Sequence, residues 1–170
     1  AQIELASSHA PWAKTPHMIP WSRLGDGSVF NRMAEEVEIP VGELWDDPDD
    51  VKAAYGESVA YSLRSVLSFV EKYGDEDLVL VLLGDHQPAT AITGHGASRD
   101  VPVTIIAHDP AVTELISDWG WQDGLRPDPE APVWRMDAFR DRFLAAFSPD
   151  PPQVASRPAP PLQRRAPTMP

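Results

Sequence analysis

The stretch Leu78-Val79-Leu80-Val81-Leu82-Leu83-Gly84-Asp85-His86-Gln87-Pro88 decides the fold that we expect for this 170-residue chain. Six consecutive aliphatic residues lie between the acidic run at 75–77 and Gly84. A strand with one wet face would alternate apolar and polar residues, so the unbroken run predicts a strand buried on both faces. The polar pair Asp85 and His86 follows at once, at the carboxyl end of the strand, which is where open α/β sheets bind their ligands.

A second strand is predicted at 101–107, with Pro102 near its start, where a missing backbone donor is tolerated. We expect it to lie beside the strand at 78–84 and parallel to it. The joining loop at 87–99 is short for a parallel crossover, so it should leave the sheet edge as a loop rather than a full helix. The expected fold is α/β, with a mostly parallel sheet flanked by helices.

Two long helices and one more strand complete the expected domain. Asp47-Pro48-Asp49-Asp50 combines an N-cap, a proline at the first helical position and acids in the first turn, and Gly74 marks the end of a helix of about 26 residues. Met136 to Phe147 predicts a second helix with one aromatic side. Residues 2–6 predict a strand, and a short helix is expected near Asn31 to Glu38.

The chain is expected to form one domain at 1–148 and a disordered tail at 149–170, which is rich in proline and arginine. No apolar run approaches the roughly 18 residues that a membrane helix needs. The chain begins with Ala1 rather than Met and enters the strand-like run at 2–6 at once, so we expect a fragment of a longer protein.

Composition excludes several classes of function. The formal net charge of −12 argues against non-specific binding to nucleic acid or to an anionic membrane surface, because both attract basic patches. The absence of cysteine excludes disulfides, cysteine-based zinc sites and a thiol nucleophile. Simple solubility is a sufficient explanation of the acidity.

Asp85 and His86 are the candidate metal ligands. A carboxylate oxygen and a neutral imidazole nitrogen together suit Zn²⁺ or Mn²⁺ better than Mg²⁺ or Ca²⁺. Two ligands do not make a tight site, so further ligands are required.

The other four histidines differ in how well they fit a site. His9 lies in Ser7-Ser8-His9-Ala10-Pro11, on irregular chain at the end of the predicted strand, although a loop histidine without a role is the alternative. His95 lies between two glycines, which let the backbone approach a ligand closely. His17 matches no pattern, and His108-Asp109 after the second predicted strand is better explained as a turn.

Gly84-Asp85-His86 after an apolar strand, followed by a glycine-bearing loop and by Arg99-Asp100-Val101-Pro102-Val103, resembles the sulfatase-like branch of the alkaline phosphatase superfamily. Within that branch the chain is most similar to lipoteichoic acid synthases, phosphoethanolamine transferases and sulfatase-domain membrane proteins of actinobacteria. The resemblance spans about residues 1–148.

This resemblance implies a metal-dependent phosphoryl or sulfuryl hydrolase or transferase of the cell envelope, with Asp85 and His86 on the metal. It implies that His9 and His95 contact the substrate phosphate or a second metal, and that Arg99 has a substrate role or a structural one. The resembling enzymes carry an acidic ligand and a Thr or Ser nucleophile in the other half of the domain, and we find neither here.

The implied partners are a phosphate or sulfate ester, a lipid-linked or polymer acceptor, and the upstream half of the same domain. The implied location is the extracytoplasmic face of a membrane, with anchoring helices outside this chain. The competing hypothesis is a non-catalytic α/β envelope module that keeps the fold for binding or scaffolding.

Overall fold

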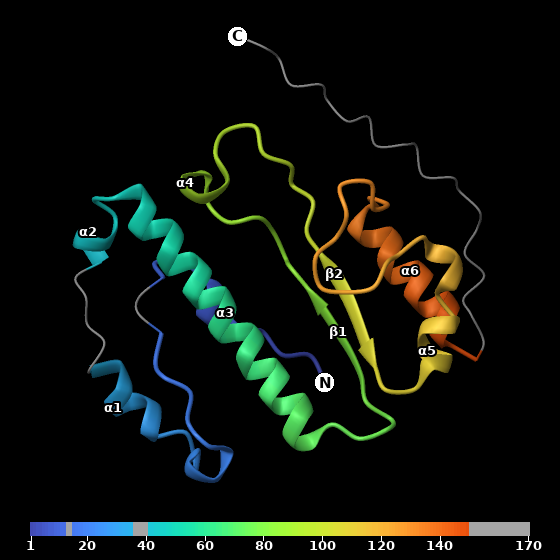
Figure 1. The fold of residues 1–170 in the computed structure, drawn as a ribbon, viewed down its shortest axis with the longest axis horizontal. Helices are drawn as coiled ribbons and strands as arrows, with labels where there is room; N and C mark the ends of the chain where they lie inside the picture. Colours follow the sequence, from blue (N-terminus) through green and yellow to red (C-terminus); the bar gives the residue numbers. More distant parts are fainter. Residues whose placement is uncertain (13–14, 36–40, 150–170) are drawn as a thin grey trace. The chain divides into compact units, whose positions relative to one another are not determined.

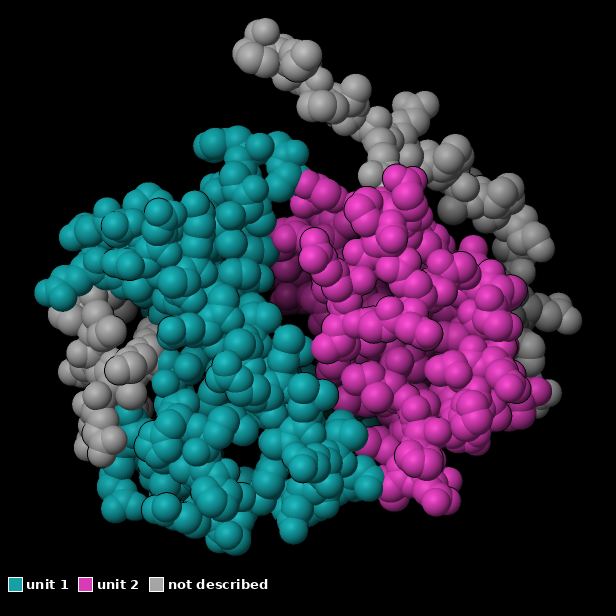
Figure 2. Space-filling model, in the orientation of Figure 1, with its two compact units in different colours: residues 1–74, 88–97 teal, residues 75–87, 98–170 magenta. Residues whose placement is uncertain are grey.

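The computed structural model describes residues 1–12, 15–35 and 41–149 (Figure 1). The chain divides into two compact units, which Figure 2 colours separately. Unit 1 comprises Ala1–Gly74 and Pro88–Ala97, and unit 2 comprises Asp75–Gln87 and the chain from Ser98 onward. Residues 88–97 therefore belong to unit 1, whereas the chain on either side of them belongs to unit 2. The candidate metal ligands precede this segment and the second strand follows it.

Helix α3 (Pro48–Tyr73) is the main element of unit 1, and the sequence predicted its length and both ends. The Asp47 side chain accepts a hydrogen bond from the backbone N–H of Asp49 at 2.8 Å, which satisfies one of the unpaired donors at the helix start. At the other end, the Gly74 N–H donates to the Val70 carbonyl at 2.8 Å. Both caps follow from local sequence, which is why the prediction succeeded.

The remaining elements of unit 1 are short. Helix α3 packs against the 3₁₀ turn η1 and against α4. The helix buries Val51 and Ser58, with 2% and 0% of their surface exposed. The other short elements of this unit are η1 (Ala6–Ser8), η2 (Trp21–Arg23), α1 (Val29–Glu35), α2 (Val41–Leu44) and α4 (Thr90–Thr93).

Unit 2 holds the sheet, which consists of β1 (Val79–Leu83) and β2 (Val103–Ala107). The two strands are neighbours, as predicted, but they are antiparallel, so the prediction of a parallel pair is wrong. Val79 pairs with Ala107, and Leu83 pairs with Val103. The connection contains only the four-residue α4, and no crossover helix carries the chain back along the sheet. The chain therefore re-enters the sheet at the end where it left.

Contacts at that end hold the two strand termini together. The Gly84 N–H donates to the Pro102 carbonyl at 3.2 Å, and the Gln87 side-chain amide donates to the Asp100 carbonyl. A β-carbon on Gly84 would lie 3.2 Å from the β-carbon of Val101, so glycine allows this close approach. Consequently, the carboxyl end of β1 lies beside the amino end of β2.

Burial of β1 also differs from the expectation. None of its five residues is fully buried, and Val79 and Leu83 are 40% and 50% exposed. Among the residues that the structure describes, β2 is the one strand that pairs with β1. A central strand of a larger sheet has a neighbour on each edge and other elements packed on both faces. Strand β1 has one neighbour in a two-stranded sheet, and its aliphatic side chains are partly exposed.

An aromatic cluster forms the core of unit 2. Trp119, 7% exposed, packs edge to face against Trp121 and Trp134 at ring-centroid distances of 5.1 and 5.2 Å. Phe139 of α6 stacks on Trp121 at 6.2 Å. Helix α6 (Met136–Phe147) has the predicted bounds, and this unit also contains α5 (Pro110–Glu114) and η3 (Ser117–Trp119).

Two further predictions near the amino terminus have different outcomes. The predicted strand at 2–6 is wrong, because this segment pairs with no strand and Ile3 is 76% exposed. The predicted helix near 31–38 corresponds to α1, although residues 36–40 lie outside the described part of the chain. The predicted tail lies almost wholly outside it as well. In the described residues, no helix has the length and apolar character to cross a membrane.

Candidate functional site

Asp85 and His86 follow β1 directly, and their donor atoms are close together. The Nε2 atom of His86 lies 3.5 Å from Oδ2 of Asp85. Two ligands of one tetrahedral zinc, each about 2.0–2.1 Å from the metal, would have donor atoms separated by roughly 3.4 Å. The observed separation matches the spacing of two ligands on one metal ion, and it is equally the spacing of a His–Asp ion pair.

The other polar atoms of the pair already have partners. Oδ1 of Asp85 accepts a hydrogen bond from the backbone N–H of His86 at 2.9 Å. Nδ1 of His86 lies 2.8 Å from the Gln87 carbonyl, which can only accept, so Nδ1 carries the hydrogen. In the neutral form of the ring the lone pair is then on Nε2, which is the tautomer that metal-binding histidines with a backbone-bound Nδ1 use.

Both side chains of the pair lie at the surface, with 86% of Asp85 and 71% of His86 exposed. Exposure leaves room for a metal ion and for further ligands. Within the described ranges, no group of three or more His, Asp or Glu residues is arranged to hold a metal ion. The donor set thus fits Zn²⁺ or Mn²⁺ in chemistry and spacing, but it supplies only two of the required ligands.

His9 belongs to unit 1, at the end of the turn η1. Its backbone N–H donates to the Ala6 carbonyl at 3.0 Å, and its Nδ1 lies 2.6 Å from the Ala10 carbonyl. His9 and His86 therefore share one arrangement, in which Nδ1 is bound to the carbonyl of the next residue and Nε2 is left available. His9 lies on irregular chain, as predicted, but it follows a 3₁₀ turn and not the predicted strand.

His95 also belongs to unit 1 and follows α4 closely. Its neighbours Gly94 and Gly96 have φ angles of +75° and +78°, a backbone conformation that glycine adopts without strain. The side chain is exposed. The structure brings Asp85 and His86 together, and it places His9 and His95 in the other unit, each with its own neighbours.

The other residues considered in the sequence either have a local structural role or are exposed. Asp109 caps α5, because its Oδ1 accepts a hydrogen bond from the Ala111 N–H at 2.9 Å, in agreement with the predicted turn at His108-Asp109. His108 lies at the opposite end of the sheet from Asp85. His17 and Arg99 are exposed.

The sequence analysis missed Trp12, which is 3% exposed and close to His9 in the chain. The available signal was a large aromatic residue directly after Pro11 in an otherwise polar loop. Trp12 stacks on Trp45 with ring centroids 5.4 Å apart and packs edge to face against Tyr55 at 5.3 Å. Burial in this cluster raises the pKa of the Tyr55 hydroxyl.

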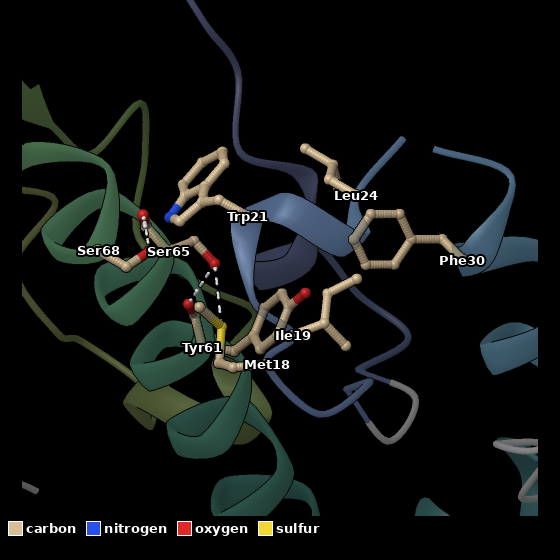
Figure 3. A pocket seen from close by; sticks show the side chains of 8 residues that line it. All are labelled: Met18, Ile19, Trp21, Leu24, Phe30, Tyr61, Ser65 and Ser68. Atoms are coloured by element: carbon tan, nitrogen blue, oxygen red, sulfur yellow. Dashed lines mark hydrogen bonds between the residues drawn. The ribbon is translucent and has the colours of Figure 1, made fainter. Parts of the chain in front are cut away.

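Unit 1 also contains a pocket of about 190 Å³ (Figure 3). Its walls are mainly apolar, and the Ser65 hydroxyl on its edge donates to the Tyr61 carbonyl at 2.9 Å. None of the predicted site residues is among its described lining residues, which are Met18, Ile19, Trp21, Leu24, Phe30, Tyr61, Ser65 and Ser68.

No protein-family model, curated protein or solved structure matches this chain.

Proposed function

We propose that this chain is the carboxyl-terminal half of the catalytic domain of a metal-dependent hydrolase or transferase of phosphate or sulfate esters in the cell envelope. The observation that supports this most directly is the spacing of the Asp85 and His86 donor atoms, 3.5 Å, with their other polar atoms held by the backbone. This is the preorganisation that a metal ligand pair requires.

In this proposal, Asp85 and His86 hold a Zn²⁺ or Mn²⁺ ion together with ligands from the upstream half of the domain. The bound ion would supply positive charge that lowers the pKa of a hydroxyl nucleophile and neutralises developing negative charge. The nucleophile is also expected from the upstream half. Alone, the described pair should bind metal weakly.

His9 and His95 are proposed to contact the non-bridging oxygens of the substrate. His9 has Nδ1 bound to the Ala10 carbonyl, so its Nε2 is the atom that faces a ligand, and protonation there would make it a donor to an anionic oxygen. The two glycines beside His95 let its loop adjust closely around a phosphate or sulfate group.

The exposed apolar surface of β1 supports the proposal that this chain is one half of a larger domain. An aliphatic strand without alternation is the type found inside larger sheets, and sheets that are mostly parallel often include an antiparallel strand. We therefore propose that the complete domain has a mostly parallel sheet in which β2 is the antiparallel member. Its proposed location is the extracytoplasmic face of a membrane, with a lipid-linked or polymer hydroxyl as acceptor in the transferase case.

The alternative is a non-catalytic envelope module that binds or organises partners. The observation in its favour is that only two potential metal ligands come together in the described residues. The two proposals differ in whether substitution of Asp85 or His86 affects turnover.

The test uses the full-length protein, stripped with a chelator and reloaded with Zn²⁺ or Mn²⁺, with aryl phosphate and aryl sulfate esters as probes. We expect Asp85→Ala and His86→Ala each to abolish metal-dependent release of the phenol. His108→Ala is the matched control, since this histidine also follows a strand but lies at the opposite end of the sheet, and it should retain activity. Full activity of the Asp85→Ala protein would leave the non-catalytic module as the explanation.

A further inference from the structure

Trp12 has a backbone conformation that few residues other than glycine adopt. Its φ angle is +52°, and it is the one non-glycine residue with positive φ in the described ranges. This region of backbone space costs free energy for a bulky side chain, so it persists only where surrounding contacts enforce it. The contacts around Trp12 must therefore be strong enough to hold this loop in one conformation.

Those contacts come from elements well separated in the chain. The indole ring stacks on Trp45, which follows α2, at an interplanar angle of 13°, and meets Tyr55 of α3 at 67°. Offset-stacked and edge-to-face pairs of this kind contribute beyond the area they bury. The Trp12 ring is thus anchored to the main helix of unit 1.

The indole N–H of Trp12 forms a hydrogen bond with the backbone of Ser8, the residue before His9. The indole Nε1–H of Trp12 donates to the Ser8 carbonyl at 2.9 Å. This hydrogen bond closes a loop of chain around His9, whose own N–H donates to the Ala6 carbonyl at 3.0 Å. Backbone on both sides of His9 is consequently fixed, and its Nδ1 is held 2.6 Å from the Ala10 carbonyl.

We propose that Trp12 is the positioning residue of His9: by anchoring the 8–12 loop to α3, it fixes the His9 ring with Nδ1 bound to the backbone and Nε2 presented outward. The significance for substrate contact rests on the proposed function, whereas the effect on the His9 ring does not. The experiment therefore has two parts.

The first part measures the His9 ring in the 170-residue chain by long-range ¹H–¹⁵N NMR, at a pH where the imidazole is neutral. We expect wild type to carry hydrogen on Nδ1 alone. Trp12→Phe keeps an aromatic ring but lacks the N–H, so it should show a mixture of both tautomers. Trp21→Phe, a substitution elsewhere in unit 1, should retain the wild-type tautomer. If Trp12→Phe also keeps the Nδ1–H form, Trp12 does not position His9.

Trp45→Leu is a second test of the positioning role, because it removes the stacking partner of Trp12 and leaves the indole N–H of Trp12 intact. We expect it to loosen the loop and to give a partial change in the His9 tautomer. Circular dichroism of each variant establishes whether α3 is still folded. Where it is, a changed His9 tautomer reflects a changed conformation of the 8–12 loop and not unfolding of the helix.

The second part is a double-mutant cycle in the full-length protein, with the ester probes and metal loading described above. Residues that support a metal or phosphate site through a neighbour typically change activity by about 10- to 100-fold, and we expect such a loss in kcat for Trp12→Phe. In the His9→Ala background the same substitution should cause no further loss, because its effect passes through His9. Additive losses would overturn the positioning role. Unchanged activity of His9→Ala would instead refute the proposed substrate contact and leave the NMR result standing.

Discussion

Nε2 of His86 lies 3.5 Å from Oδ2 of Asp85, while Nδ1 of the same ring is held 2.8 Å from the Gln87 carbonyl. Two adjacent residues thus hold one nitrogen and one oxygen close together. Because the pair is on exposed chain, this arrangement is directly accessible to titration with metal ions.

The first prediction concerns metal binding by the 170-residue chain. Co²⁺, used as a spectroscopic substitute for Zn²⁺, should bind weakly, because two protein ligands leave most coordination positions to water. His86→Ala should reduce the affinity further by at least 10-fold, whereas His17→Ala should leave it unchanged. Absorption and isothermal titration measure both. Equal affinities of wild type and His86→Ala would remove the pair as a metal site.

The second prediction tests the antiparallel register. The Gly84 N–H donates to the Pro102 carbonyl, which marks that pair as hydrogen-bonded, and hydrogen-bonded and non-hydrogen-bonded pairs alternate along an antiparallel ladder. Val81 and Ile105, three positions from Gly84 and Pro102, therefore form a non-hydrogen-bonded pair with Cα atoms about 4.5 Å apart. Such a pair is within reach of a disulfide. Val81→Cys with Ile105→Cys should cross-link on mild oxidation.

The chain has no native cysteine, so the background of this cross-linking experiment is clean. Val81→Cys with Ile106→Cys is the control, since Ile106 projects from the opposite face of the sheet. Mass spectrometry before and after reduction counts the linked product. Efficient cross-linking of the control, with none between 81 and 105, would show a different register.

The third prediction concerns the start of α3. Asp47→Ala removes the acceptor for the Asp49 N–H and should lower the free energy of unfolding of unit 1 by about 1 kcal/mol. Asp47→Asn retains a side-chain oxygen that caps equally well, so its stability should stay near wild type. Urea unfolding followed by circular dichroism compares the three proteins. A loss for Asn as large as that for Ala would show that charge, rather than the cap, stabilises this helix end.

The fourth prediction concerns pH and α6. A side-chain hydrogen bond from Arg135 holds the pKa of Asp137 below its usual value of 3.8. A carboxyl whose pKa is lower in the folded state stabilises that state above its unfolded pKa, and the contribution is lost as pH falls through the folded pKa. Stabilisation from this pair should therefore be complete at neutral pH, begin to weaken as pH approaches the usual value of 3.8, and be lost as pH falls through the lower pKa of the folded state.

NMR titration of the Asp137 carboxyl measures this directly. Arg135→Gln should return its pKa to near the usual value, because the paired guanidinium, 2.9 Å away, is gone. Arg140→Gln should have little effect on Asp137, since Arg140 pairs with Asp141 at 2.7 Å. An Asp137 pKa that is unchanged by Arg135→Gln would exclude the ion pair in solution.

Local signals in the sequence located helices α3 and α6, strand β1 and the candidate pair Asp85 and His86. An N-cap, a proline at the first helical position and a glycine after the last turn defined α3, and aromatic periodicity defined α6, because these signals act within a few residues. The aliphatic run located β1, and Asp85 and His86 are adjacent on irregular chain directly after it, where their donor atoms lie 3.5 Å apart. The two helices needed no distant partner to be located, whereas β1 also required β2 as its neighbour.

Contacts between distant residues were decided by tertiary structure alone. The direction of β2 depends on where the chain re-enters the sheet, which the Gly84–Pro102 hydrogen bond and the short α4 decide. A strand at 2–6 failed to form because a strand needs a neighbour to satisfy its backbone groups, and periodicity carries no information on that neighbour. Likewise, nothing in the residues around His9 indicated that Trp12 would reach Trp45 and Tyr55, since the stacking of rings more than 30 residues apart is a property of the folded chain.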